Sequence, residues 1–239
     1  MNFLPLISTL VTFAFAAAVL RRYFVRHGPH LLLWTFGLVL YGIGTLTEVI
    51  LSLSFHGLVL KAWYLTGAML TAAWLGQGTL HLLVRKGRTA WYFTAGLALV
   101  SLVALVLVAT APLTSAAASF QTTVPVSTQY KAILVRSGGI TALTILLNIY
   151  GTITMVGGAI YSAYLFWRKQ VLIQRVIGNI LIAAGALFPA MAGSFVKAGL
   201  VDGLYISELL GAVLMFIGFI NATTQAAPQP APAPTQVQY

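Results

Sequence analysis

Long apolar segments alternate with short polar connections along this chain, and this pattern sets the fold class. Seven windows of about 20 predominantly apolar residues are each long enough to cross a bilayer as a helix. They cover residues 3–20, 31–55, 58–84, 90–111, 138–166, 172–196 and 202–221. None shows the alternation of a membrane barrel strand. The pattern predicts an all-α integral membrane protein whose seven-transmembrane-helix bundle occupies residues 1–221.

Two polar regions lie outside these segments. Residues 112–137 form a connection too long for a simple turn, so we expect either a lid over a pocket or, more simply, a passive cap. Residues 222–239 are rich in Pro, Ala and Gln and carry no charge. That composition predicts a disordered tail, because it offers little apolar surface to bury.

The composition places the chain in a lipid bilayer. Hydrophobic residues make up 59% and charged residues 7% of the sequence, whereas about a quarter of the residues in soluble domains are charged. The net charge of +10 comes from short basic runs between apolar segments. Such runs fit anionic lipid headgroups, and they lack the interleaved aromatics of a nucleic-acid surface. We therefore expect no nucleic-acid partner.

The basic residues also predict an orientation. Alternate connections are enriched in them, and these connections hold Arg21, Arg22, Arg26, Arg85, Lys86, Arg88, Arg168, Lys169 and Arg175. The opposite side holds Lys61, Lys131, Arg136 and Lys197. Because basic connections stay in the cytoplasm, nine residues against four predict an external N-terminus and a cytoplasmic C-terminus.

A weak internal repeat is also visible. When the second and third segments are shifted by 141 positions onto the sixth and seventh, Gly44 meets Gly185 and Tyr64 meets Tyr205. A parallel 3+1+3 repeat is an arrangement found in transporters. It resembles that of the sugar transporters called SWEETs, but this chain lacks their Pro-rich helices.

Two carboxylates give the main clue to function. Glu48 and Glu208 lie inside apolar segments of a chain that has three acidic residues in all. In the predicted orientation both lie about 10 Å below the outer surface. An ionisable group in the membrane is costly and usually faces a partner, a cavity or a pathway. We expect an outward-facing polar pocket in which Glu48 and Glu208 bind a cation, an amine or a proton.

Polar residues at helical spacings predict the rest of this pocket. Tyr41 and Thr45 share a helix face with Glu48, and Tyr205 lies three residues before Glu208. The predicted lining is Tyr41, Thr45, Tyr64, Asn148, Thr152 and Tyr205. Two structural alternatives remain open. In one, Glu48 pairs with Lys61 and the outer end of the seventh helix pairs with Lys197. In the other, each Glu is protonated and bonded to Tyr, Thr or Ser.

The sequence offers little that predicts an enzyme or a cofactor protein. No catalytic residue is expected, because the chain lacks a nucleophile with its base, an HExxH motif or clustered aspartates. The histidines lie at different depths, which argues against haem and zinc. The seven-helix topology resembles that of microbial rhodopsins and G-protein-coupled receptors. Residues 202–221 contain no Lys for a retinal Schiff base, so covalent retinal is excluded.

Three functions fit these features. The first is a binding or sensing protein for a small organic or lipidic ligand, which signals through a membrane protein partner. The second is a small, proton-coupled transporter that uses Glu48 or Glu208, with a polar route continuing through Gln77 and Asn179. The third is a ligand-free assembly subunit of a larger complex. Residues 21–49, from RRYFV to LTEV, resemble bacterial membrane proteins of no assigned activity, so we expect the bacterial inner membrane.

Overall fold

The computed structural model describes residues 3–84, 88–169, 173–197 and 202–223, and for residues 190, 192–197 and 202 it describes the backbone alone. Within these ranges the regular structure is helical, with loops between the helices and one isolated antiparallel bridge between Leu113 and Leu134. The predicted tail lies outside the described residues from position 224 onward.

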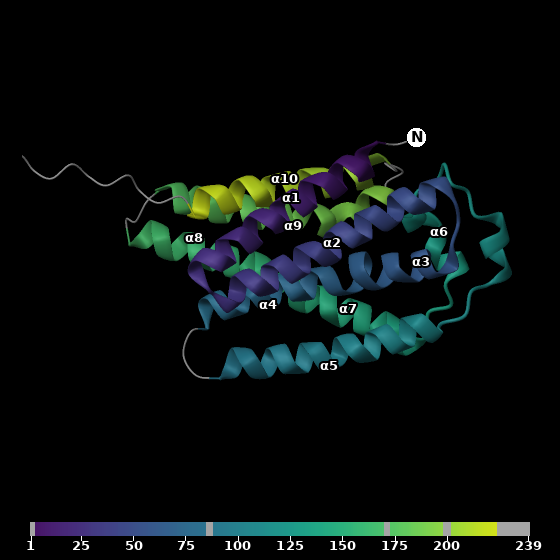
Figure 1. Cartoon of the computed structure of the whole chain (residues 1–239), viewed down its shortest axis with the longest axis horizontal. Coiled ribbons are helices and arrows are strands. Elements are labelled where there is room, and N and C mark those ends of the chain that lie inside the picture. Colours follow the sequence, from purple (N-terminus) through teal and green to yellow (C-terminus); the bar gives the residue numbers. More distant parts are fainter. Residues whose placement is uncertain (1–2, 85–87, 170–172, 198–201, 224–239) are drawn as a thin grey trace, which may run out of the picture.

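Long helices run back and forth along one direction and lie side by side (Figure 1). Those in the described ranges are α1 (Leu4–Arg26), α2 (Pro29–Leu53), the continuous span Gly57–Leu83, α5 (Thr89–Thr110), the continuous span Gly138–Arg168, α9 (Ile173–Lys197) and α10 (Asp202–Thr223). Six of them are long and apolar enough to cross a membrane. In α9 the apolar stretch Ile173–Pro189 is shorter, so a seventh span stays a prediction. The fold is that of a multi-pass membrane protein.

Local sequence explains the first two helices. Proline is favoured in the first turn of a helix, where Pro5 and Pro29 lie in α1 and α2. His27 ends α1 in the left-handed conformation, with a φ of 49°. The helix runs six residues beyond its predicted end because long Arg side chains can lie along apolar surface and reach water. One of them, Arg22, donates to the carbonyl oxygen of Thr223 at 2.8 Å and so ties the end of α1 to the end of α10.

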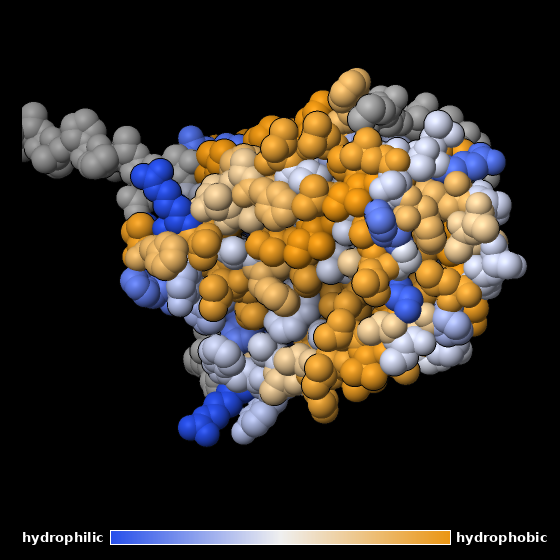
Figure 2. Space-filling model, turned by 45° about the vertical axis from the view of Figure 1, so that its right-hand side comes forward, coloured by the Kyte–Doolittle hydropathy of each residue, from blue (hydrophilic) through white to orange (hydrophobic). Residues whose placement is uncertain are grey.

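The surface agrees with a membrane location. Figure 2 shows a broad apolar surface over the helices, with hydrophilic residues concentrated toward the two ends. The helix α5 lies at the edge of the bundle (Figure 1), and only 17% of its apolar window is buried inside the protein, compared with 56% for α2. Most of α5 is therefore available to lipid.

Two of the long spans contain π-helical turns. Between α3 (Gly57–Trp63) and α4 (Thr71–Leu83) lies η1, a π-helix over Tyr64–Leu70. A second π-helix, η3 (Ile153–Gly157), separates α7 (Gly138–Thr152) from α8 (Gly158–Arg168). A third irregularity is Pro189 inside α9. Because π-turns are rare and recur at functional sites, a cavity lined by these turns is a candidate functional site.

Glycine allows the helices that contain these turns to approach closely. A Cβ on Gly44 of α2 would lie 2.8 Å from the Cα of Gly67 in η1. A Cβ on Gly151 of α7 would lie 2.2 Å from the carbonyl carbon of Ala72 in α4. No side chain fits at either crossing, so backbone contacts backbone, as is common where membrane helices pack.

The 112–137 loop folds over one end of the bundle, which we call the loop end. It contains the short 3₁₀ helix η2 (Ser115–Ser119) and the helix α6 (Val126–Ile133). The amide of Thr114 donates to the carbonyl oxygen of Ile133 at 2.9 Å and so closes the base of the loop. The ring of Phe120 lies 4.9 Å from that of Phe55, next to the end of α2. These contacts hold the loop against the bundle.

Candidate functional site

A cavity of about 550 Å³ lies inside the bundle, toward the loop end. Helix α2, the span Gly57–Leu83, the helices α6, α7, α9 and α10, and η3 all contribute to its wall. The lining residues used below are Tyr41, Thr45, Glu48, Trp63, Gly67, Thr71, Ala72, Leu75, Ser127, Tyr130, Lys131, Asn148, Gly151, Thr152, Met155, Ala186, Pro189, Glu208 and Met215. Its volume falls within the range of small-molecule pockets in proteins.

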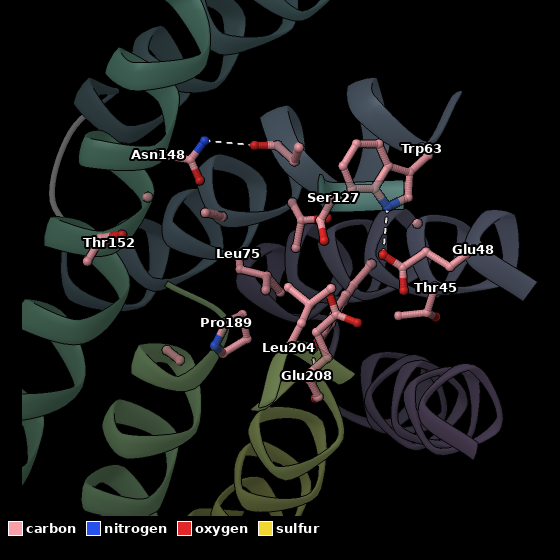
Figure 3. A pocket seen from close by; sticks show the side chains of 18 of the residues that line it. Thr45, Glu48, Trp63, Leu75, Ser127, Asn148, Thr152, Pro189, Leu204 and Glu208 are labelled. Atoms are coloured by element: carbon pink, nitrogen blue, oxygen red, sulfur yellow. Dashed lines mark hydrogen bonds between the residues drawn. The ribbon is translucent and has the colours of Figure 1, made fainter. Parts of the chain in front are cut away.

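The two predicted carboxylates meet in this cavity. Glu48 lies five residues before the end of α2 and Glu208 six residues after the start of α10, which places both about 8–9 Å from the loop end of their helices. Figure 3 shows the two carboxyl groups turned toward each other. The match in depth predicted from the sequence therefore corresponds to proximity in the structure.

The hydrogen bonds of the carboxylates are incomplete. Glu48 is 3% exposed, and its Oε1 accepts a bond from the indole nitrogen of Trp63 at 2.8 Å (Figure 3). The Oε2 atoms of Glu48 and Glu208 are buried and accept no bond from another residue, and the two carboxyl groups lie within hydrogen-bonding reach of each other. A buried polar atom without a partner costs free energy, so natural proteins rarely keep one without a use.

Four of the six predicted lining residues lie in the cavity wall: Tyr41, Thr45, Asn148 and Thr152. The hydroxyl of Tyr41 donates to the backbone carbonyl of Glu208 at 2.8 Å and thereby joins α2 to α10 beside the carboxylates. The amide of Asn148 donates to the carbonyl of Ala68 in η1 at 2.8 Å. That bond satisfies the backbone of a π-helical turn, as neighbouring helices must do in a membrane.

The other two predicted lining residues, Tyr64 and Tyr205, are not among the residues that line the cavity. Tyr64 is 1% exposed, and its hydroxyl shares a 2.9 Å hydrogen bond with Thr144. Tyr205 is buried in a small cluster with Leu204 and Leu4. Helical spacing alone therefore did not place these two side chains correctly.

The pairing of Glu48 with Lys61 does not occur in the structure. The ammonium of Lys61 donates to the backbone carbonyl of Ala109 at 2.7 Å, at the end of α5. The side chain of Lys197 lies outside the described residues. The second alternative has Tyr, Thr or Ser bonded to each Glu, whereas the side-chain donor to Glu48 is the indole nitrogen of Trp63.

Trp63 and the loop are the parts of the site that sequence reasoning missed. Trp63, Gly67, Thr71 and Leu75 recur every four residues and all line the cavity, and this spacing was a usable signal. From α6, Ser127, Tyr130 and Lys131 line the cavity as well.

Tyr130 holds α6 against the cavity wall. Its ring lies 5.2 Å from the ring of Trp63 and 5.6 Å from that of Tyr64. The guanidinium of Arg136 lies 5.2 Å from its ring centre. Burial raises the pKa of the Tyr130 hydroxyl, and Arg136 lowers it by a smaller amount. The loop therefore covers the cavity with an aromatic side chain, as expected of a lid.

A second polar cluster lies deeper in the bundle and away from the cavity. Gln77 is fully buried, and its amide nitrogen donates to Ala90 at 3.0 Å and to Thr94 at 2.8 Å. Its amide oxygen accepts a bond from the hydroxyl of Tyr150. His81 shares a 2.7 Å bond with Thr94. The amide of Gln77 therefore has partners at both ends, which is what a structural role requires.

The residues predicted to continue a polar route, Gln77 and Asn179, do not line the cavity. Asn179 donates to the carbonyl of Arg175 within its own helix at 2.8 Å. The cavity wall farthest from the loop is instead apolar and includes Leu75, Met155 and Met215. Within the described ranges, no three His, Asp or Glu side chains come together as metal ligands would.

Comparison with known proteins gives no further guide, because no protein family, curated protein or solved structure matches this chain. The fold defines a multi-pass membrane protein. The function is therefore inferred from the residues that line the cavity.

Proposed function

We propose that this protein binds a small organic or lipidic ligand in the cavity between Glu48 and Glu208. It acts as a binding or sensing protein of the bacterial inner membrane and passes its ligand state to a membrane protein partner. One observation carries the proposal. Two buried carboxyl groups, whose Oε2 atoms accept no bond from another residue, line a cavity of about 550 Å³. Such groups become favourable when a ligand supplies the missing partner.

The cavity faces outward in this proposal, and seven spans place the N-terminus outside and the C-terminus in the cytoplasm. The distribution of charge supports this orientation. In the described ranges, one end of the bundle carries Arg21, Arg22, Arg26, Arg88, Arg168, Lys169 and Arg175. The loop end, where the cavity lies, carries Lys61, Lys131 and Arg136. Basic residues favour the cytoplasmic side, so the loop end is external.

A small transporter is the second candidate, and the irregular helices favour it. Gly67 and Ala68 of η1, Met155 of η3, and Pro189 of α9 all line the cavity. Three helices thus depart from regular geometry at the level where a ligand would bind, and such places serve as hinges. Binding ranks first because the cavity ends at an apolar wall. A ligand-free assembly subunit ranks last, since the carboxyl groups of Glu48 and Glu208 would have no role in it.

Native mass spectrometry of the gently purified protein tests this proposal. We expect a co-purified small molecule that is lost in Glu48→Gln and in Glu208→Gln. Gln77→Met is the matched control, because Gln77 is also polar and buried in the membrane but lies outside the cavity. The bound mass should remain in that variant. A wild-type protein that carries no ligand under these conditions, and none after incubation with a lipid extract, would contradict the proposal.

A further inference from the structure

We infer that the ligand is an amphiphilic organic ammonium compound, whose charged nitrogen lies between Glu48 and Glu208 and whose apolar body points toward Leu75, Met155 and Met215. This inference rests on the proposed function and names the class of ligand. It follows from the two ends of the cavity, which differ in chemistry.

The end near the loop suits a cation. Glu48 and Glu208 point at one place and lie within hydrogen-bonding reach of each other, and no other residue donates to either Oε2 atom. Two ionised carboxylates so placed repel each other, and a positive charge between them removes that repulsion. The aromatic rings of Trp63 and Tyr130 line the same end, and aromatic faces attract ammonium groups. An anionic ligand would meet the same two carboxylates and be repelled.

An organic cation fits this end better than a metal ion. Ca²⁺ and Mg²⁺ require six or more oxygen ligands in a defined geometry. Here two carboxyl groups are accompanied by aromatic rings and a Trp63 indole that is itself a donor. An ammonium group needs fewer acceptors and gains from the rings.

The far end suits an apolar body. Leu75, Met155 and Met215 are 5%, 8% and 2% exposed and line the cavity away from the loop. The same three side chains line a second, apolar cavity of about 30 Å³, together with residues that include Phe15 and Phe219. Methionine side chains are flexible and repack around different shapes. An alkyl or aryl group can therefore displace them and extend into the space beyond.

Among the residues that the structure describes, Lys131 is the one positive side chain in the cavity wall. It lies on α6 and is exposed, so its ammonium is hydrated at the mouth of the cavity. A zwitterionic ligand such as an amino acid would place its carboxylate there. Such a ligand would leave the apolar wall without a partner, and this is why we favour a ligand whose second end is apolar.

A series of four six-carbon probes, with methylammonium as a fifth, tests the inference. The protein is placed in lipid nanodiscs, and binding of hexylammonium, hexanol, hexanoate, 6-aminohexanoate and methylammonium is measured by titration calorimetry against empty nanodiscs. We expect hexylammonium to bind at least about 10-fold more tightly than each of the others. Loss of the charge removes the carboxylate contact, and loss of the chain removes apolar burial.

Variants connect this selectivity to the site. Glu48→Gln and Glu208→Gln should reduce the preference for hexylammonium over hexanol to about 3-fold or less, while Asn221→Ala, outside the cavity, should leave it unchanged. A thermal unfolding curve for each variant identifies any that does not fold.

Three results would overturn the inference. They are equal binding of hexanol and hexylammonium, tighter binding of 6-aminohexanoate, and no binding of any probe. The proposed function is judged separately. If a neutral or anionic molecule co-purifies and depends on Glu48, the cavity is a ligand site and only the ligand class is wrong. If nothing co-purifies and no probe binds, both fail.

Discussion

The two polar clusters inside this bundle differ in one physical respect, namely whether their buried atoms have partners. In the inner cluster, the amide nitrogen and oxygen of Gln77 bond to Ala90, Thr94 and Tyr150. In the outer cluster, the Oε2 atoms of Glu48 and Glu208 accept no bond from another residue, and both residues line a large cavity. A polar residue in a membrane segment therefore does not by itself mark a binding site. A buried polar group that other residues leave unsatisfied, next to a cavity, does.

The backbone shows the same contrast. The outer cluster is surrounded by η1, η3 and Pro189, where helices lose regular geometry. The inner cluster joins the regular helices α4, α5 and α7. Irregular turns cost stability, and a protein keeps them where a ligand or a movement requires them. The comparison predicts that changes in the outer cluster alter binding and that changes in the inner cluster alter stability.

The largest expected effect is on binding at the carboxylates. Replacing Glu48 or Glu208 by Gln should weaken hexylammonium binding by about 30-fold or more, because removing one partner of a buried charge pair costs roughly 2–5 kcal/mol. Titration calorimetry in nanodiscs measures the change. Gln77→Met should keep the wild-type affinity. If both kinds of variant weakened binding equally, the distinction between the clusters would be lost.

The next effect concerns the close contact between the backbones of α7 and α4. Gly151→Ala in α7 places a methyl group against the backbone of Ala72 in α4 and should lower the free energy of unfolding by about 1–3 kcal/mol. Unfolding in detergent with a denaturant measures this. The matched control is Gly96→Ala in α5, where an added Cβ meets nothing within 4 Å. Equal losses in the two variants would show that the close approach does not exist.

A smaller effect is expected at the lid. Tyr130→Ala removes two aromatic contacts, each worth about 0.5–1.5 kcal/mol, and should raise the dissociation rate of the ligand about 3- to 10-fold. Tyr130→Phe keeps both rings in contact and should behave as wild type. Stopped-flow displacement gives the rate. An unchanged rate in Tyr130→Ala would make the loop a passive cap, which was the simpler expectation from the sequence.

The smallest effect is a loss of lid contacts at high pH. Burial raises the pKa of Tyr130 above its usual value of 10.0, so the neutral hydroxyl is favoured in the folded protein. Its contribution to stability is present below pH 10.0 and is lost as the pH rises through the raised pKa. Tryptophan fluorescence should report a transition above pH 10.0 that is absent in Tyr130→Phe. A transition common to both proteins would have another origin.

The sequence predicted the membrane class, most helix positions and the shared depth of Glu48 and Glu208, because apolar length and depth along a helix follow directly from residue order. It left open whether the two side chains face each other. Periodicity also found Tyr41, Thr45, Asn148 and Thr152. It could not find the π-turns, which have no sequence signature and change which residues face inward. Tyr64 was also predicted to line the cavity, yet its hydroxyl bonds Thr144.

The loop residues were beyond prediction for a different reason. Ser127 and Tyr130 approach the cavity through a loop whose path depends on long-range contacts, such as the one between Phe120 and Phe55. Local spacing carries no information on such contacts. Trp63 was not predicted as a site residue, because tryptophan is common at the membrane interface, whereas its indole nitrogen bonds a buried carboxylate.

Thermal unfolding of the Glu48→Gln/Glu208→Gln double variant beside Gln77→Met tests the central claim most directly, namely that the carboxylates serve a ligand and not the fold. We expect the double variant to unfold at the wild-type temperature or higher, because it no longer holds two carboxyl groups next to each other in the membrane interior. Gln77→Met should unfold at a lower temperature, since Tyr150 loses its acceptor at a cost of about 1–3 kcal/mol. A double variant destabilised as much as Gln77→Met would show that Glu48 and Glu208 are structural, and it would contradict the account.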